Sequence, residues 1–196
     1  MAKPDYLHKT LLLLVLALAG VASVAPLSSR VLAAEQAVAP EKNPPGDIPD
    51  SQVFVDYRSK LGFSIKAPEG WSRNERTDGV HFADKFGALD VSIMTSAAAL
   101  TVETVKTNEA AALEKSARAV KITAVRSVKL ASGPGILIKY TSNSEPNAVT
   151  NRQIRLEHDR YLLTTSDRLA TIDLSAPDGA DNVDQWTLMS GSFRWQ

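Results

Sequence analysis

Apolar and polar side chains alternate in several short stretches of the first half of the chain, and this alternation predicts strands. In residues 89–94 (LDVSIM), Leu89, Val91 and Ile93 share one face, while Asp90 and Ser92 take the other. Such a period of two is typical of a strand with one buried face. Further short strands are predicted at residues 53–57, 62–65 and 80–83.

A helical period follows and predicts an amphipathic helix over residues 101–120. The segment has neither Pro nor Gly, and Ala110, Leu113, Ala117 and Val120 recur at steps of three and four residues. Because this apolar stripe consists of small residues, the helix can lie close to a sheet.

The second half of the chain predicts a run of antiparallel strands and a closing helix. Gly and Pro at residues 132–135 mark the turn of a first hairpin. His158, Asp159 and Arg160 are expected at the tip of a second one, and Pro177 is expected to end the last long strand. The strands are predicted at residues 122–130, 136–141, 152–157, 161–165 and 169–175, the closing helix at 178–189 and a final short strand at 192–195.

This order of elements predicts an α+β fold. Strands come first, then a helix, then a meander of strands and a last helix, whereas a parallel nucleotide-binding sheet would alternate strand and helix throughout. We therefore expect an α/β/α sandwich around a central antiparallel sheet.

The N-terminus has the layout of an export signal. Lys3 and Lys9 precede sixteen uncharged residues at positions 10–25, and small residues follow near a cleavage point that we place after Ala33. An uncleaved membrane anchor is the alternative, because about 20 uncharged residues can span a bilayer. The predicted organisation is a signal peptide at residues 1–33, a Pro-rich linker at 34–52 and one domain at 53–196.

Composition excludes several classes of protein. The chain has no Cys, so disulfide scaffolds, Cys-ligated metal centres and lipid-modified lipoproteins are excluded. Basic and acidic residues both number 22, and without the leader the chain stays nearly neutral. This balance argues against nucleic-acid binding and against attachment of the mature chain to anionic lipid.

Two motifs resemble the PsbP-like family. The first is Phe54-x-x-Tyr57 followed by Gly62-Phe63-Ser64-Ile65-x-x-Pro68-x-Gly70-Trp71, and the second is Leu174-Ser175-Ala176-Pro177 followed by an acidic segment and Gly191-Ser192-Phe193. The resemblance spans residues 53–195. By themselves the residues of the first motif indicate a strand and a tight turn, with Trp71 folded over the core; a ligand platform is the alternative for Trp71.

The resemblance implies the same α/β/α sandwich and a role in binding. The family contains extrinsic photosystem II subunits of the thylakoid lumen, bacterial extracytoplasmic proteins of unknown role and a Ran-binding nuclear import factor. The metal ligands of that family cannot be matched to positions in this sequence, so no metal site is carried over from the resemblance.

Two histidines outside the leader are candidates for chemistry. His81 lies between apolar neighbours in a predicted strand and is expected to be a hydrogen-bonded structural residue. His158 and Asp159 could belong to a Ser-His-Asp triad, whose members need not be close in sequence. The chain has no G-x-S-x-G motif, however, so we predict no enzyme and no catalytic residue.

Two charged groups remain as candidate binding residues. Asp178, Asp181 and Asp184 recur every three residues and could attract calcium, although their spacing is not that of an EF-hand loop and helix N-termini favour acidic residues in any case. Four basic residues on neighbouring predicted strands could form a docking patch for an acidic partner, or simply a solvated sheet edge. They are Lys129, Lys139, Arg152 and Arg155.

These observations favour a monomeric, non-catalytic binding or assembly module that docks a protein partner outside the inner membrane. Its location would be the periplasm, the thylakoid lumen or the extracellular space, and its partner would be photosystem II if the host is photosynthetic. The alternative is a periplasmic carrier of a small apolar ligand or a weak hydrolase using His158 and Asp159. Apart from calcium, no cofactor is expected.

Overall fold

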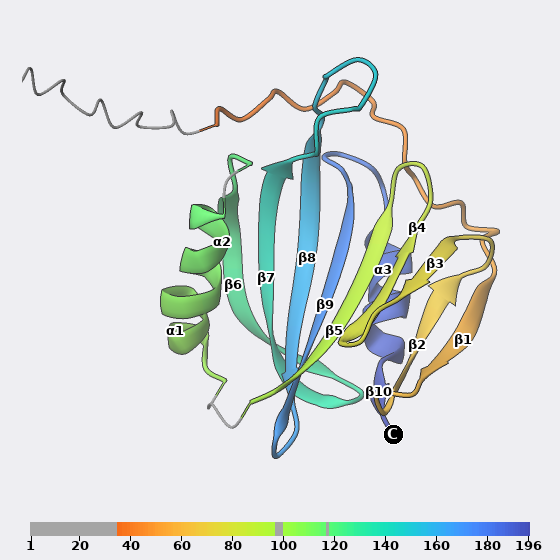
Figure 1. The fold of residues 1–196 in the computed structure, drawn as a ribbon, viewed down its shortest axis with the longest axis vertical. Helices are drawn as coiled ribbons and strands as arrows, with labels where there is room; N and C mark the ends of the chain where they lie inside the picture. Colours follow the sequence, from red (N-terminus) through yellow and green to blue (C-terminus); the bar gives the residue numbers. More distant parts are fainter. Residues whose placement is uncertain (1–34, 97–99, 117) are drawn as a thin grey trace, which may run out of the picture. The chain divides into compact units, whose positions relative to one another are not determined.

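The predicted alternation of side chains produces a seven-stranded antiparallel sheet (Figure 1). The structure, a computed structural model, describes residues 35–96, 100–116 and 118–196. In spatial order the strands are β3 (Ser72–Glu75), β4 (Gly79–Ala83), β5 (Ala88–Thr95), β9 (Arg168–Pro177), β8 (Arg155–Thr164), β7 (Gly133–Asn143) and β6 (Lys121–Leu130).

One face of this sheet is apolar and carries the main core. Leu89, Leu163 and Leu174 on this face are fully or almost fully buried. They pack with helix α3 (Val183–Ser192) and with a small antiparallel sheet. That sheet consists of β1 (Phe54–Ser59), β2 (Phe63–Pro68) and β10 (Arg194–Trp195), with β2 in the middle.

The other face is covered over only part of its width. The helical segment consists of α1 (Val102–Val105), a π-helical turn η1 (Lys106–Ala110) and α2 (Ala111–Lys115). It packs on apolar residues of β7 and β8, whereas β4 and β5 contribute no residue to this second core. Helices therefore lie on both faces of an antiparallel sheet, which confirms the expected α+β sandwich.

Several predicted elements are confirmed with altered limits. The helix expected over residues 101–120 ends at Lys115, and its predicted stripe residue Ala117 lies outside the described residues. The predicted first hairpin forms, but its turn lies at residues 131–132, because residues 133–135 already pair with β6 as part of β7. The end of β9 at Pro177 is as predicted. The turn at Gly70, where φ is +88°, and the burial of Phe63 and Ile65 also agree.

The predicted second hairpin is wrong. His158, Asp159 and Arg160 lie in the middle of the continuous strand β8, and the turn to β9 comes later, where the Thr165 amide donates to the Arg168 carbonyl. Three polar residues in succession indicated a turn, but here they alternate between two faces that each offer partners of opposite charge.

The Pro-rich segment belongs to the folded unit, which differs from the free linker that its composition predicted. Ile48 is buried in the main core, and its amide donates to Asn182 Oδ1 at 2.7 Å. Near the start of the described chain, the Val38 amide donates to Asn143 Oδ1 at 3.0 Å. The predicted signal peptide lies outside the described residues. Within the described ranges, no helix is long and apolar enough to cross a membrane.

Candidate functional site

Polar side chains gather on the part of the second sheet face that the helical segment leaves uncovered. His81, Asp90, Asp173 and Arg160 are successive cross-strand neighbours on β4, β5, β9 and β8. They line a cavity of about 450 Å³ together with His158 and other residues of these strands. We call this surface the open face. Its polar side chains and the buried Leu89 and Val91 lie on opposite sides of the sheet, because successive side chains of a strand alternate between the two faces.

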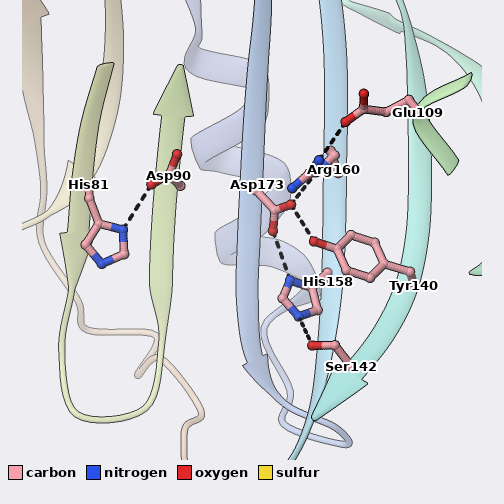
Figure 2. A network of polar contacts seen from close by, with 8 residues as sticks. All are labelled: His81, Asp90, Glu109, Tyr140, Ser142, His158, Arg160 and Asp173. Carbon is pink, nitrogen blue, oxygen red and sulfur yellow. Dashed lines mark hydrogen bonds and ion pairs between the residues drawn. The ribbon is translucent and has the colours of Figure 1, made fainter. Parts of the chain in front are cut away.

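Asp173 is the centre of the polar network on the open face (Figure 2). His158 Nδ1 lies 2.9 Å from its Oδ1, while Tyr140 Oη and Arg160 Nε donate to its Oδ2 at 2.7 and 2.5 Å. Burial alone would raise the pKa of Asp173, but these hydrogen bonds and the charges of its neighbours lower it. The carboxylate is therefore ionised at neutral pH, and its oxygens are already occupied.

His158 connects Asp173 to a serine. Its ring stacks on Tyr140 with 4.2 Å between the centroids, and its Nε2 lies 2.9 Å from Ser142 Oγ. When Nδ1–H donates to Asp173, the Nε2 of a neutral imidazole accepts a hydrogen bond from the Ser142 hydroxyl. This is the order of hydrogen bonds found in an acyl-transfer triad.

The accessibility of Ser142 is unlike that of a nucleophile. Ser142 is 7% exposed and lies within strand β7, opposite Leu156 of β8. It does not line the cavity of the open face, although His158 and Asp173 do. A nucleophile must reach an acyl carbon about 3 Å away, with donors placed for the oxyanion. The three residues therefore have the connectivity of a triad but not its access to substrate.

A second cluster occupies the far side of the open face. Arg76 donates two hydrogen bonds to Asp90, at 2.7 and 2.9 Å, and His81 Nδ1 lies 3.2 Å from the same carboxylate. The hydrogen bonds to Asp90 raise the pKa of Arg76. His81 is hydrogen-bonded, as predicted, but it is also part of the open face.

An ion pair joins the open face to the helical segment. Glu109 of the π-helical turn accepts from Arg160 Nη1 at 2.7 Å. Burial alone would lower the pKa of Arg160, but the charge of Asp173 and its other acidic contacts raise it. Arg160 is thus a permanent cation held between two carboxylates, and π-helical turns occur frequently at functional sites.

The sequence-predicted metal candidates are not brought together. Asp178 and Asp181 precede α3, which begins at Val183, and only Asp184 lies in its first turn. The Asp181 amide instead donates to Asp47. Among the described residues, no group of three or more His, Asp and Glu side chains is placed to hold a metal ion.

The predicted basic patch is also dispersed. Lys139 lies on the same face as Leu137 and forms an ion pair with Asp159, whereas the register places Lys129 on the opposite face, across from Pro134. Arg155 is 5% exposed and donates to Asn143, Thr141 and Ala119 inside the protein, so it cannot dock a partner. Arg152 is exposed in the loop before β8.

Two other expectations concern Trp71 and Asp159. Trp71 packs against the main core, which agrees with its predicted structural role. Asp159 is not the partner of His158, because the two adjacent residues of β8 point to opposite faces. Tyr140, Ser142, Arg160 and Asp173 were missed as site residues, although residues 171–175 alternate in the same way as residues 90–94.

Comparisons with known proteins give distant structural likenesses. No family model and no curated protein matches the chain. A crystal structure from Bacteroides thetaiotaomicron is 11% identical, with 68% of this chain and 45% of that one covered and a TM-score of 0.47. This chain thus spans less than half of that protein.

The solution structure of cyanobacterial PsbP (CyanoP) from Synechocystis is 16% identical, with 77% of this chain and 98% of that one covered and a TM-score of 0.45. Membership of the PsbP-like family stays a prediction, and the α+β architecture is established by the strands and helices of this chain itself.

Proposed function

We propose that this protein is a non-catalytic binding module, exported across one membrane, that docks a protein partner on its open face. The observation that carries the proposal is the part of the second sheet face that the helical segment leaves uncovered. A sheet face of this width that is not buried is normally either fully solvated or occupied by another molecule. Here its two central carboxylates have partners, because Asp90 and Asp173 each accept from two or three side chains.

A fixed pattern of charges favours recognition over reaction. Side chains that are locked by mutual hydrogen bonds lose little conformational entropy when a partner binds. At the edge of the cavity, Met94 is 58% exposed and supplies an apolar contact beside the polar ones. If the host is photosynthetic, the motif resemblance makes photosystem II or its assembly intermediates the expected partner.

Site-specific crosslinking tests the proposed docking surface. A photoreactive phenylalanine at position 94 should capture a partner from an extracytoplasmic membrane extract. The same residue at position 149 is the control, because Val149 is 92% exposed but lies in a distant loop. Capture at position 94 alone supports the proposal. Equal capture at both positions, or none at position 94, contradicts it.

A hydrolase is the second candidate, and the Ser142–His158–Asp173 connectivity is the observation that favours it. A fluorophosphonate probe labels a serine only when a neighbouring base activates it and the probe can reach it. We expect no labelling of Ser142, because it is buried. Labelling that disappears in Ser142→Ala would replace the binding proposal with a catalytic one.

A further inference from the structure

A second cavity lies beneath the helical segment and differs in character from the open face. It has a volume of about 360 Å³, and its walls are largely apolar. Leu100, Val105 and Ala112 line it from the helical side, and Leu162 and Leu169 line it from the sheet. We call it the helix cavity. Its volume is within the range of small-molecule sites, which begins near 300 Å³.

The helix cavity and the cavity of the open face are neighbours. Glu109 and Leu169 line both of them, so the apolar space and the polar one share a wall at these two side chains. A molecule that occupied both would have an apolar part beside Leu162 and a polar part beside Arg160. The juxtaposition therefore selects an amphipathic ligand.

The charges at the boundary identify the polar part. Arg160 is held firmly through Nε by Asp173, whereas its Nη1 donates to Glu109, whose side chain is 38% exposed. Asp173 accepts from three side chains and Asp90 from two residues, so these carboxylates are not free to receive a cation. Glu109 is the group that a ligand can displace most easily.

A ligand carboxylate would take the place of the Glu109 carboxylate at Arg160 and carry the same single charge. It would accept from Arg160 as the Glu109 side chain does now, while Glu109 turned toward solvent. Arg–carboxylate hydrogen bonds are short, strong and geometrically selective. A doubly charged head group would instead add repulsion from Asp173 and Asp90, which face the same cavity.

We propose that this protein binds an amphipathic carboxylate, such as a medium-chain fatty acid, with its alkyl chain in the helix cavity and its carboxylate on Arg160 in place of Glu109. Three observations support this site: the two cavities adjoin, they share a wall, and the ion pair between Arg160 and Glu109 lies at that wall. It is independent of protein docking on the open face, since either could fail while the other holds.

Calorimetric titration of the purified protein with decanoate tests the proposal. Decanol has the same alkyl chain without the charge, and acetate has the charge without the chain. We expect decanoate to bind at least about tenfold more tightly than either. Failure of decanoate to bind, or equal affinity for decanoate and decanol, would overturn the proposal.

Two variants locate the ligand. Glu109→Gln should bind decanoate about two- to fivefold more tightly, because the ligand no longer has to displace a partly exposed charged partner of Arg160. Weaker binding by this variant would contradict the proposed exchange. Ala112→Phe should fill the mouth of the helix cavity and reduce binding by about tenfold or more.

Ala111→Phe is the matched control, because Ala111 neighbours Ala112 but does not line the helix cavity. It should leave the affinity unchanged. Equal loss in both Phe variants would show a general disturbance of the helix and would overturn the assigned location. Thermal unfolding followed by circular dichroism verifies that each variant is folded, and a site-resolved chemical-shift map replaces calorimetry for any variant that is destabilised.

Discussion

The two faces of the seven-stranded sheet hold buried carboxylates in opposite ways. Asp173 on the open face accepts from three side chains, and its pKa is lowered despite its burial. On the face toward α3, burial raises the pKa of Asp159, whose Oδ1 has Lys139 Nζ at 3.1 Å. Two carboxylates on adjacent strands therefore differ because three side chains donate to Asp173, whereas the desolvation of Asp159 outweighs its ion pair with Lys139.

This difference teaches what each face contributes. The face toward α3 supplies stability through apolar burial, and a charge there is tolerated at a cost. The open face supplies a preorganised polar surface, where each charge is fixed by its neighbours. The network around Asp173 does not by itself indicate that the face serves stability, since a buried ion pair is weak evidence for stability.

The largest expected effect is on the apolar face. Leu174 is completely buried and precedes Ser175, which lines the open face. Leu174→Ala should lower the free energy of unfolding by about 2–5 kcal/mol, because it removes apolar contacts and leaves a cavity. Ser175→Ala should change it by less than about 0.5 kcal/mol. Urea unfolding measures both, and similar losses in the two variants would contradict the division between the faces.

The second effect is at the centre of the network. Asp173→Asn should lower the free energy of unfolding by about 2–4 kcal/mol at neutral pH, because Arg160 and His158 lose a charged partner. The more exposed Asp90 is the control, and Asp90→Asn should cost less than about 1 kcal/mol.

The pH dependence of the Asp173 effect has a defined sign. Because the folded-state pKa of Asp173 lies below its ordinary value of 3.8, its ionised form stabilises the fold at all pH values above that. The stabilisation is lost as the pH falls through the lowered pKa. The difference between the wild type and Asp173→Asn should therefore shrink on strong acidification, and a difference that grew would disprove the shift.

The smallest of the expected changes is at Asp159, where the substitution should stabilise the protein instead of destabilising it. Its folded-state pKa lies above the ordinary value of 3.8, so the wild type loses stability as the pH rises through the raised pKa. The Asn side chain cannot ionise, so the stability of Asp159→Asn relative to the wild type should increase as the pH rises through that interval. The net gain at neutral pH should stay below about 1 kcal/mol, because the ion pair with Lys139 is also removed. Unfolding curves of both proteins at pH 4 and pH 7 measure this difference. If Asp159→Asn were more stable relative to the wild type at pH 4 than at pH 7, the raised pKa would be contradicted.

Local patterns in the sequence were enough to predict much of the sheet. Leu89, Val91 and Ile93 alternate with polar residues, and Pro177 ends a strand, since both signals act over a few neighbouring residues. The helix after Thr101 was predicted from its period, although its π-helical turn was not. Its end at Lys115 was not predicted either, because the following residues favour a helix equally well.

The candidate site was mostly beyond prediction. His158, Asp159 and Arg160 looked like a turn because three polar residues in a row have no local reason to be buried. Only the pairing of β8 with β7 and β9 supplies Asp173 for His158 and Arg160, and Lys139 for Asp159. The basic patch failed for the same reason, since a bulge between Ile122 and Ala124 and the register of β6 decide which face each lysine takes.

The sequence by itself determined which residues would be buried along most strands and that an antiparallel α+β sheet would form. These properties depend on side-chain periodicity, which is local. The tertiary structure alone decided which polar residues meet, how far the helical segment extends over the sheet and where Glu109 closes the boundary between two cavities. These properties depend on strand register and packing between distant segments, and a shift of one residue would send every one of the paired charges to the other face.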